Sequence, residues 1–245
     1  MYVKRLLVLL ACGLILPAAA GAESLRYSAV SSWNMPYGKF DGDQLVDGIM
    51  YDLAQAIAKQ LQIPVTFVVL PRKRVDAAAM GGDIDLRCYL TPQWTEVPDQ
   101  YVWSGKLFEV TDVIFGAAGS PPLLNVDAIP RGTIVSTVLG YGYSTLAPYF
   151  ASGHLKREDT VDQEKVNLKM TAGRTPYGLS ETEALNWYQR LTPMHRHSDW
   201  RLVVSRNDFQ CGIPKKGAIA APRILKALES MKKSNQFEEI LRKYR

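Results

Sequence analysis

The chain has 245 residues, of which 47% are hydrophobic and 22% are charged, and its formal net charge is +5. This composition is typical of a globular protein and excludes a disordered or fibrous chain. The positive charge is small and dispersed, which excludes a nucleic-acid-binding surface, because such a surface needs a basic stripe or cluster.

Residues 1–22 have the pattern of a secretory signal peptide. Two positive residues precede an apolar stretch at 6–16, and the small residues Ala20-Gly21-Ala22 form a cleavage site. A membrane-spanning helix needs about 20 apolar residues, and this stretch is shorter. We therefore expect cleavage before Glu23, export to the periplasm, and a net charge that falls from +5 to +3 with the loss of those two positive residues. A lipoprotein anchored through Cys12 is the weaker alternative, because an apolar tail would follow the lipid directly.

After this leader, strand and helix patterns alternate. Apolar residues recur every three or four positions across 49–61, which predicts an amphipathic helix, and Gly81-Gly82 indicates the end of a second helix. The alternation predicts parallel strands joined by crossover helices, so the fold class is α/β. In chain order we expect a strand at 25–30, a helix at 49–61, a strand at 65–70, a helix at 74–80 and a strand at 84–90.

The same order repeats in a weaker form after residue 111. No low-complexity linker separates the two parts, which fits two lobes that share strands crossing between them. Ser234 is a suitable N-cap for the last helix. The predicted elements are strands at 112–116, 133–138, 177–179, 201–204 and 210–213, and helices at 144–150, 182–190, 222–230 and 235–244.

Several short motifs along the mature chain share their order and spacing with one known family. The segment from Gly48 to Ala58 matches the pattern G-F-x-x-D-L-x-x-x-I-A closely. The other matching segments are Met35-Pro36-Tyr37, Gly82-Asp83-Ile84-Asp85, Tyr101-Val102-Trp103-Ser104, Lys216-Gly217 and Lys243-Tyr244. Together they cover nearly all of the mature chain, which thus resembles the family 3 periplasmic solute-binding proteins, the receptors of polar amino-acid ABC importers.

The resemblance implies a two-lobed periplasmic-binding-protein type 2 fold, with a hinge and a ligand cleft between the lobes. Residues 23–111 would form the first lobe and 112–211 the second. Residues 212–245 would return to the first lobe as C-terminal helices. It also implies a monomer that binds a small molecule without a cofactor and delivers it to an inner-membrane ABC permease.

Some site residues of the first lobe follow from the same resemblance. Relatives cover the ligand with an aromatic ring after the first strand, so Trp33 and Tyr37 are candidates, although either residue could simply pack the loop. Where relatives have an arginine that binds a carboxylate, this chain has Trp94. Tryptophan cannot form the two-pronged charged pair with a carboxylate that arginine forms, and binding of an amino acid therefore needs another cation.

Three other arginines are candidates for that cation. Arg72 and Arg74 open the second predicted helix, whose N-terminus favours anions. Arg87 lies at a strand end beside Tyr89, in a segment that is shorter than in the family. A solvated surface position is the alternative for these arginines.

Two segments supply candidates in the second lobe. Gly140-Tyr141-Gly142-Tyr143 falls where relatives have a loop at a helix start, and glycines there let backbone N–H groups approach an anionic ligand. A simple tight turn is the alternative. Glu181 corresponds to the acid that receives the ligand's ammonium group in relatives. Its alternative is a carboxylate that stabilises a helix start.

Two cysteines, Cys88 and Cys211, remain after the leader is removed. In an oxidising compartment they can form a disulfide, worth about 4–5 kcal/mol in the chain-entropy model, and two buried thiols are the alternative. His195 and His197 could be a metal pair, but no further ligands accompany them, so no metal site is expected.

The leading hypothesis is a periplasmic binding protein for a small polar solute, either amino-acid-like or an organic anion, rather than an enzyme. One alternative is a sensing or accessory module without transport, because Trp94 replaces the family arginine. The other is an enzyme similar to periplasmic cyclohexadienyl dehydratase, with Glu181 as general acid or base. No hydrolase, zinc-protease or phosphate-loop motif occurs in the sequence.

Overall fold

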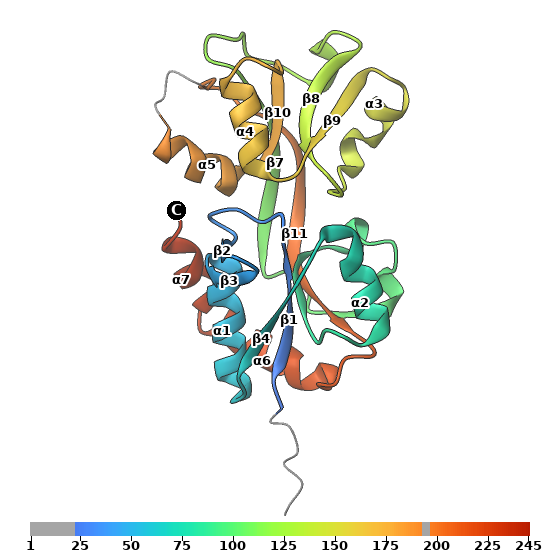
Figure 1. Ribbon diagram of the computed structural model, residues 1–245, viewed down its shortest axis with the longest axis vertical. Helices are drawn as coiled ribbons and strands as arrows, with labels where there is room; N and C mark the ends of the chain where they lie inside the picture. The colour runs from blue at the N-terminus through green and yellow to red at the C-terminus, as the bar shows by residue number, and fades with distance from the viewer. Residues whose placement is uncertain (1–22, 193–196) are drawn as a thin grey trace, which may run out of the picture.

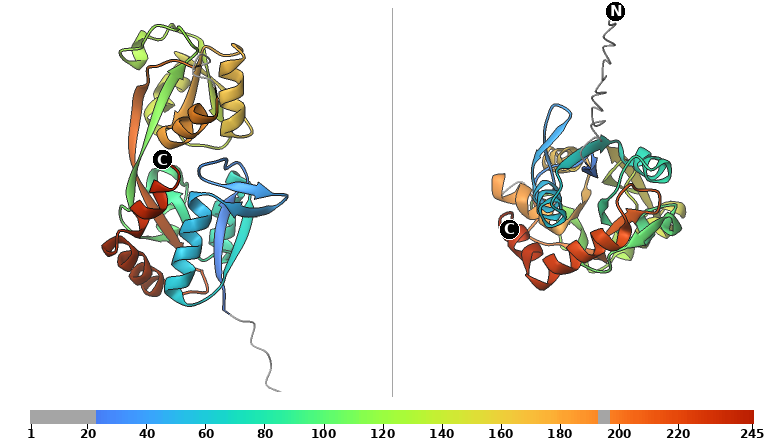
Figure 2. Two further views of the ribbon diagram at one scale, coloured as in Figure 1. Left: turned by 90° about the vertical axis from the view of Figure 1, so that its left-hand side faces the viewer. Right: turned by 90° about the horizontal axis from the view of Figure 1, so that it is seen from below.

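Two long strands, β7 (Phe108–Gly116) and β11 (Leu202–Pro214), run between two lobes (Figure 1). They pair antiparallel along most of their length. In the side view on the left of Figure 2, these strands lie along one edge of the molecule. The structure is a computed structural model that describes residues 23–192 and 197–245. The predicted signal peptide, Cys12 and His195 lie outside the described residues.

The first lobe is built around a parallel strand pair. Its elements are β1 (Leu25–Val30), β2 (Lys39–Asp41), β3 (Gln44–Asp47), α1 (Ile49–Leu61), β4 (Val65–Leu70), the 3₁₀ turn η1 (Arg72–Arg74), α2 (Val75–Gly81), β5 (Arg87–Leu90), β6 (Tyr101–Trp103), α6 (Ala221–Lys233) and α7 (Gln236–Arg242). β1 and β4 pair in parallel, and a parallel bridge joins Tyr27 to Leu86. The predicted crossover arrangement is therefore confirmed, and α2 ends at Gly82 with φ of 82°.

The second lobe is a mixed sheet with helices on both faces. Its elements are β8 (Thr133–Val138), the 3₁₀ turn η5 (Ser144–Leu146), α3 (Ala147–Ala151), β9 (Leu155–Thr160), α4 (Gln163–Thr171), β10 (Tyr177–Glu181) and α5 (Thr182–Leu191). β8 pairs in parallel with β9 and β10, and β10 pairs antiparallel with β7. The strand order β5-β11-β7-β10-β8-β9 makes one sheet continue through both lobes.

Separate cores support the two lobes. One large cluster of buried side chains fills the first lobe, and two smaller clusters cover the two faces of the second-lobe sheet. Alternate residues of β7 supply these faces, with Val113 and Phe115 on one side and Ile114 on the other. Ala184 of α5 packs into the first-lobe cluster, so α5 contacts both lobes.

A buried carboxylate ties the C-terminal segment to the first lobe. Asp85 is fully buried and accepts hydrogen bonds from Arg26 Nε at 2.9 Å and from the Ala218 backbone N–H at 2.6 Å. Arg26 lies on β1, and Ala218 precedes α6. Asp85, the last residue of the Gly82-Asp83-Ile84-Asp85 motif, therefore holds the segment before α6 against β1 of the first lobe.

Two expectations from the sequence need correction, and some elements were not predicted. The two strands predicted at 201–204 and 210–213 are one strand, because the polar residues between them lie on a crossing segment that is partly exposed. Ser234 is not an N-cap: its hydroxyl donates to the Ser230 carbonyl at 3.0 Å and ends α6, while α7 follows Asn235. The β2–β3 hairpin, β9 and α4 were not predicted.

No helix of the described residues is long and apolar enough to cross a bilayer. No group of three or more histidine, cysteine or acidic side chains in those residues could hold a metal ion. The Cys88–Cys211 disulfide is present, and it joins β5 to β11.

Candidate functional site

A cavity of about 60 Å³ lies between the lobes. At about 10–15 Å³ for each water, this space holds roughly four to six water molecules. Both lobes line it: the first with Ser32, Trp33, Asn34, Met35, Tyr37, Arg72, Tyr89 and Trp94, and the second with Asp112, Tyr141, Gly142, Tyr143, Gln163, Ser180, Glu181 and Ala184. Eight of the nine ligand-binding residues predicted from the sequence are among them, and Arg87 is the exception.

Tyr89 is the centre of the aromatic wall in the first lobe. Its ring stacks on Tyr37 with centroids 4.3 Å apart and meets Trp94 edge-on at 5.9 Å. Its φ of 58° lies in the left-handed region, which is rare for a bulky residue, and the register of β5 and β11 shifts beside it. Such a bulge re-aims a side chain, and here the ring enters the cavity.

The disulfide lies next to this bulge. Cys88 precedes Tyr89 on β5, and Cys211 pairs with Cys88 on β11. The covalent link thus holds together the two strands whose register shift turns the ring into the cavity. Its position indicates support for the aromatic wall as well as for the first-lobe core.

Arg72 is the arginine that reaches the cavity. It lies on η1, and its NH2 donates to the Trp94 carbonyl at 3.1 Å. Its guanidinium carbon lies 5.9 Å from the ring centroid of Tyr141 in the second lobe. Burial, and then the charge of Arg87, lowers the pKa of Arg72 to about 10, so it remains positive near neutral pH.

Arg87 does not face the cavity, contrary to the prediction. Its side chain is 1% exposed and forms an ion pair with Asp76 of α2. Its NH1 also donates to the Tyr101 hydroxyl at 2.9 Å. Successive side chains of a strand point to opposite faces, and the sequence alone did not show which face Arg87 takes. Arg74 is exposed and does not line the cavity either.

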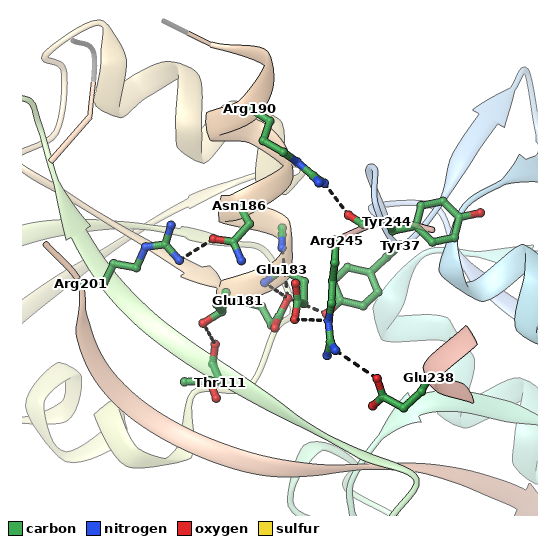
Figure 3. Close-up of polar contacts among 12 residues, drawn as sticks. Tyr37, Thr111, Glu181, Glu183, Asn186, Arg190, Arg201, Glu238, Tyr244 and Arg245 are labelled. Atoms are coloured by element: carbon green, nitrogen blue, oxygen red, sulfur yellow. Dashed lines mark hydrogen bonds and ion pairs between the residues drawn. The ribbon is translucent and has the colours of Figure 1, made fainter. Parts of the chain in front are cut away.

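Glu181 has the helix-start role considered for it, and it also lines the cavity. As N-cap of α5, its Oε2 accepts backbone N–H bonds from Glu183 at 2.9 Å and Ala184 at 3.2 Å. The same oxygen accepts the Tyr37 hydroxyl of the first lobe at 2.5 Å (Figure 3). Burial raises the pKa of Glu181 from 4.5 to about 7, although these three hydrogen bonds act in the opposite direction.

Asp112 is a functional candidate that the sequence analysis missed. It lies on β7 directly opposite Glu181 of β10, and it lines the cavity. It accepts hydrogen bonds from the Ser205 hydroxyl at 2.5 Å and the Asn207 amide at 3.2 Å. Burial raises its pKa from 3.8 to about 6. An acid at the start of an otherwise apolar strand was the signal that could have identified it.

The glycine loop approaches the first lobe closely. Gly142 lines the cavity, and a Cβ on it would lie 3.9 Å from the Trp94 ring. Gly140 has φ of 78°, and a Cβ there would lie 3.4 Å from the side chain of Arg72. The loop is also a tight turn, since the Tyr141 N–H bonds the Val138 carbonyl at 3.2 Å. The tight-turn reading of the glycines therefore applies, and the approach of their backbone N–H groups to an anionic ligand stays a prediction.

A larger groove of about 960 Å³ opens beside the cavity. The two share Trp33, Asn34, Met35, Gln163 and Ala184, so these residues separate the interior from the groove. The groove runs between the β2–β3 hairpin side of the first lobe and helices α4 and α5 of the second.

The fold of the chain occurs in several solved structures. It is similar to an ancestral arginine-binding protein bound to arginine, with 22% identity and a TM-score of 0.73 over 90% of this chain and 97% of that one. It is also similar to the GluR0 ligand-binding core from Nostoc punctiforme in complex with L-glutamate, with 15% identity and a TM-score of 0.71 over 90% and 98% of the two chains.

A third similar structure is the ancestral amino-acid-binding protein AncCDT-1, a precursor of cyclohexadienyl dehydratase, with 18% identity and a TM-score of 0.71 over 90% and 94% of the chains. At these identities the likeness shows the two-lobed fold alone. No curated protein matches the chain by sequence. The sequence pattern of the bacterial extracellular solute-binding proteins, family 3, matches residues 28–245, and the chain belongs to this family.

Proposed function

We propose that this protein captures a small amino-acid-like solute between its lobes in the periplasm and delivers it to an inner-membrane ABC permease. One observation carries the proposal. The cavity has a guanidinium from the first lobe, Arg72, and a carboxylate from the second, Glu181. A ligand with a carboxylate and an ammonium group would bind both and hold the lobes together.

The aromatic wall supports the same reading. Tyr37, Tyr89 and Trp94 offer flat apolar faces beside these charged groups, as sites for small organic ligands commonly do. Trp94 occupies the position of the arginine in relatives, and Arg72 supplies the positive charge from η1 instead. Some similar solved structures bind arginine or L-glutamate, which fits an amino-acid-like ligand.

A thermal-shift screen of amino acids, amines and organic acids tests this function. A true ligand raises Tm, because binding stabilises the folded state by RT ln(1 + [L]/Kd). Each hit is then titrated by calorimetry. Absence of stabilisation by every compound that carries both a carboxylate and an ammonium group would contradict the proposal.

We propose in addition that residues 1–22 are a signal peptide that is cleaved on export. In the mature protein, residues 23–111 would form the first lobe, residues 112–211 the second, and residues 212–245 the C-terminal helices that return to the first. The expected result is a mature N-terminus at Glu23 after expression in a bacterial host, read by mass spectrometry of the periplasmic fraction. A lipid attached to Cys12, or retention of the full leader, would contradict it.

A second candidate function is an elimination reaction in the same cavity. The pKa of Glu181, raised by burial to about 7, suits a general acid or base at neutral pH. Incubation of each thermal-shift hit with the protein, followed by mass spectrometry, separates the two functions. Turnover that is lost in Glu181→Gln supports the enzyme, whereas an unaltered ligand supports the binding protein.

A further inference from the structure

Two carboxylates face the cavity from neighbouring strands, and together they narrow the class of ligand. Asp112 of β7 and Glu181 of β10 are register partners in an antiparallel pair, and both line the cavity. Directly opposite residues of such a pair have Cα atoms about 4.5–5.5 Å apart. Two like charges at this spacing are unfavourable unless something positive lies between or beside them.

Neither carboxylate forms an ion pair with a cationic side chain among the described residues, although the charge of Glu181 acts on Arg201. Glu181 accepts hydrogen bonds from the Tyr37 hydroxyl and two backbone N–H groups, and Asp112 accepts them from Ser205 and Asn207. All of these donors are neutral.

The arginines nearest to α5 are engaged elsewhere (Figure 3). Arg201 donates to the Asn186 side chain at 2.7 Å and to Gln189, and Arg245 forms ion pairs with Glu183 and Glu238. Arg201 is not among the lining residues of the cavity. When both cavity carboxylates are ionised, as at pH 8, a cationic group of the ligand would offset their charge, because a buried carboxylate without a cation is costly.

On the opposite side, Arg72 forms no ion pair with an acidic residue of the described chain. Its guanidinium bonds the Trp94 carbonyl and approaches the Tyr141 ring. The cavity therefore presents one positive and two negative side chains. A ligand that matches all three has one carboxylate and two cationic groups.

We propose that Asp112 and Glu181 form a paired acidic site that selects amino acids with a second cationic group over amino acids with a neutral side chain. This inference rests on the proposed function, and it assigns Asp112 as the residue that determines specificity. Glu181 receives one cationic group, Arg72 receives the carboxylate, and Asp112 receives the second cationic group on the crossing strand.

Ornithine and norvaline test the proposal, because they have the same carbon chain and differ only in the terminal ammonium group. Calorimetry of the mature protein at pH 8 is expected to give at least tenfold tighter binding of ornithine. In Asp112→Asn the ratio of the two affinities is expected to fall at least tenfold. Glu109→Gln is the matched control, because Glu109 lies on the same strand but outside the cavity, and its ratio should equal that of the wild type.

Each result has a distinct meaning. Equal binding of ornithine and norvaline by the wild type would overturn the inference but leave the proposed function intact, and it needs no variant. An equal loss of both affinities in Asp112→Asn would also overturn it, because the residue would then have only a structural role. Absence of binding by both compounds, with no stabilisation by other amino acids, would overturn the inference and the proposed function together.

Discussion

The two walls of the cavity are built differently. The first-lobe wall consists of aromatic rings held in place by packing, a register shift and a disulfide. The second-lobe wall offers carboxylates at the end of β10 and on the crossing strand β7, with neutral hydrogen-bond partners. The difference indicates that the first lobe sets the shape of the site, whereas the second supplies most of its charge.

The largest expected effect concerns the disulfide of the first wall. The double variant Cys88→Ser, Cys211→Ser should lose about 4–5 kcal/mol of unfolding free energy, since the cross-link closes a long loop. Urea unfolding under oxidising conditions measures this loss. Reduction of the wild type should give the same shift and leave the double variant unaffected. An unchanged midpoint in the double variant would contradict a structural role for the bond.

Arg87 is the next test, because it separates stability from binding within one segment. In Arg87→Met, Asp76 loses its buried cationic partner, and a loss of about 3–5 kcal/mol of unfolding free energy is expected. Arg74→Met is the matched control, since Arg74 is exposed, and its stability should change by less than about 0.5 kcal/mol. Equal stability of the two variants would show that the Arg87–Asp76 pair contributes nothing to the fold.

The second wall predicts a pH dependence without ligand. The pKa of Glu181 is raised by burial from 4.5 to about 7, so between these values the folded state holds a proton that the unfolded state releases. The unfolding free energy should therefore fall as pH rises through this window, by roughly 3 kcal/mol from this group. Asp112 should act in the same direction between pH 3.8 and about 6.

Other groups around Glu181 do not offset this effect. Burial and the Glu181 charge hold the pKa of Tyr37 well above 10, so this hydroxyl stays neutral, and Glu183 is ion-paired with Arg245. Burial lowers the pKa of Arg201, and the charges of Glu183 and Glu181 act in the opposite direction. Thermal unfolding at pH 4.5, 6 and 7.5 checks the prediction. Glu181→Gln should show a flatter profile than the wild type, and identical profiles would rule out titration of Glu181 as the cause.

The smallest expected effect concerns contacts between the lobes outside the cavity. Arg190 of α5 donates to the Tyr244 carbonyl (Figure 3). The rings of Trp187 and Tyr244 have centroids 6.1 Å apart. Arg190→Ala should favour the open form and weaken ligand binding about two- to fivefold, the range of exposed polar contacts. Calorimetry measures the affinity. A loss as large as that of a cavity variant would contradict this ranking.

Much of the fold could be predicted from the sequence. Regular apolar spacing identified α1, the β-branched run identified β4, and glycines identified the end of α2. Segments whose sequence is largely polar were missed: β9 carries four charged residues among six, and the β2–β3 hairpin is mostly exposed. In these elements pairing with neighbours, rather than hydrophobic pattern, decides the structure.

The site was predictable to the extent that family motifs mark it. Those motifs identified Tyr37 and Glu181, but they could not show that Arg72 enters the cavity while Arg87 turns toward α2. Asp112 was missed for a similar reason. Its role depends on the strand that pairs with β7, and the register of β7 with β10 and β11 is not visible in the sequence.

The central claim is that one ligand is held at the same time by Arg72 of the first wall and Glu181 of the second. The most direct test is calorimetry of the best thermal-shift hit with the wild type, Arg72→Ala, Glu181→Gln and the double variant. Each single change should weaken binding more than tenfold. The fold loss of affinity in the double variant should be smaller than the product of the two single losses, because one broken anchor already prevents closure on the ligand. Wild-type affinity in both single variants would contradict the account.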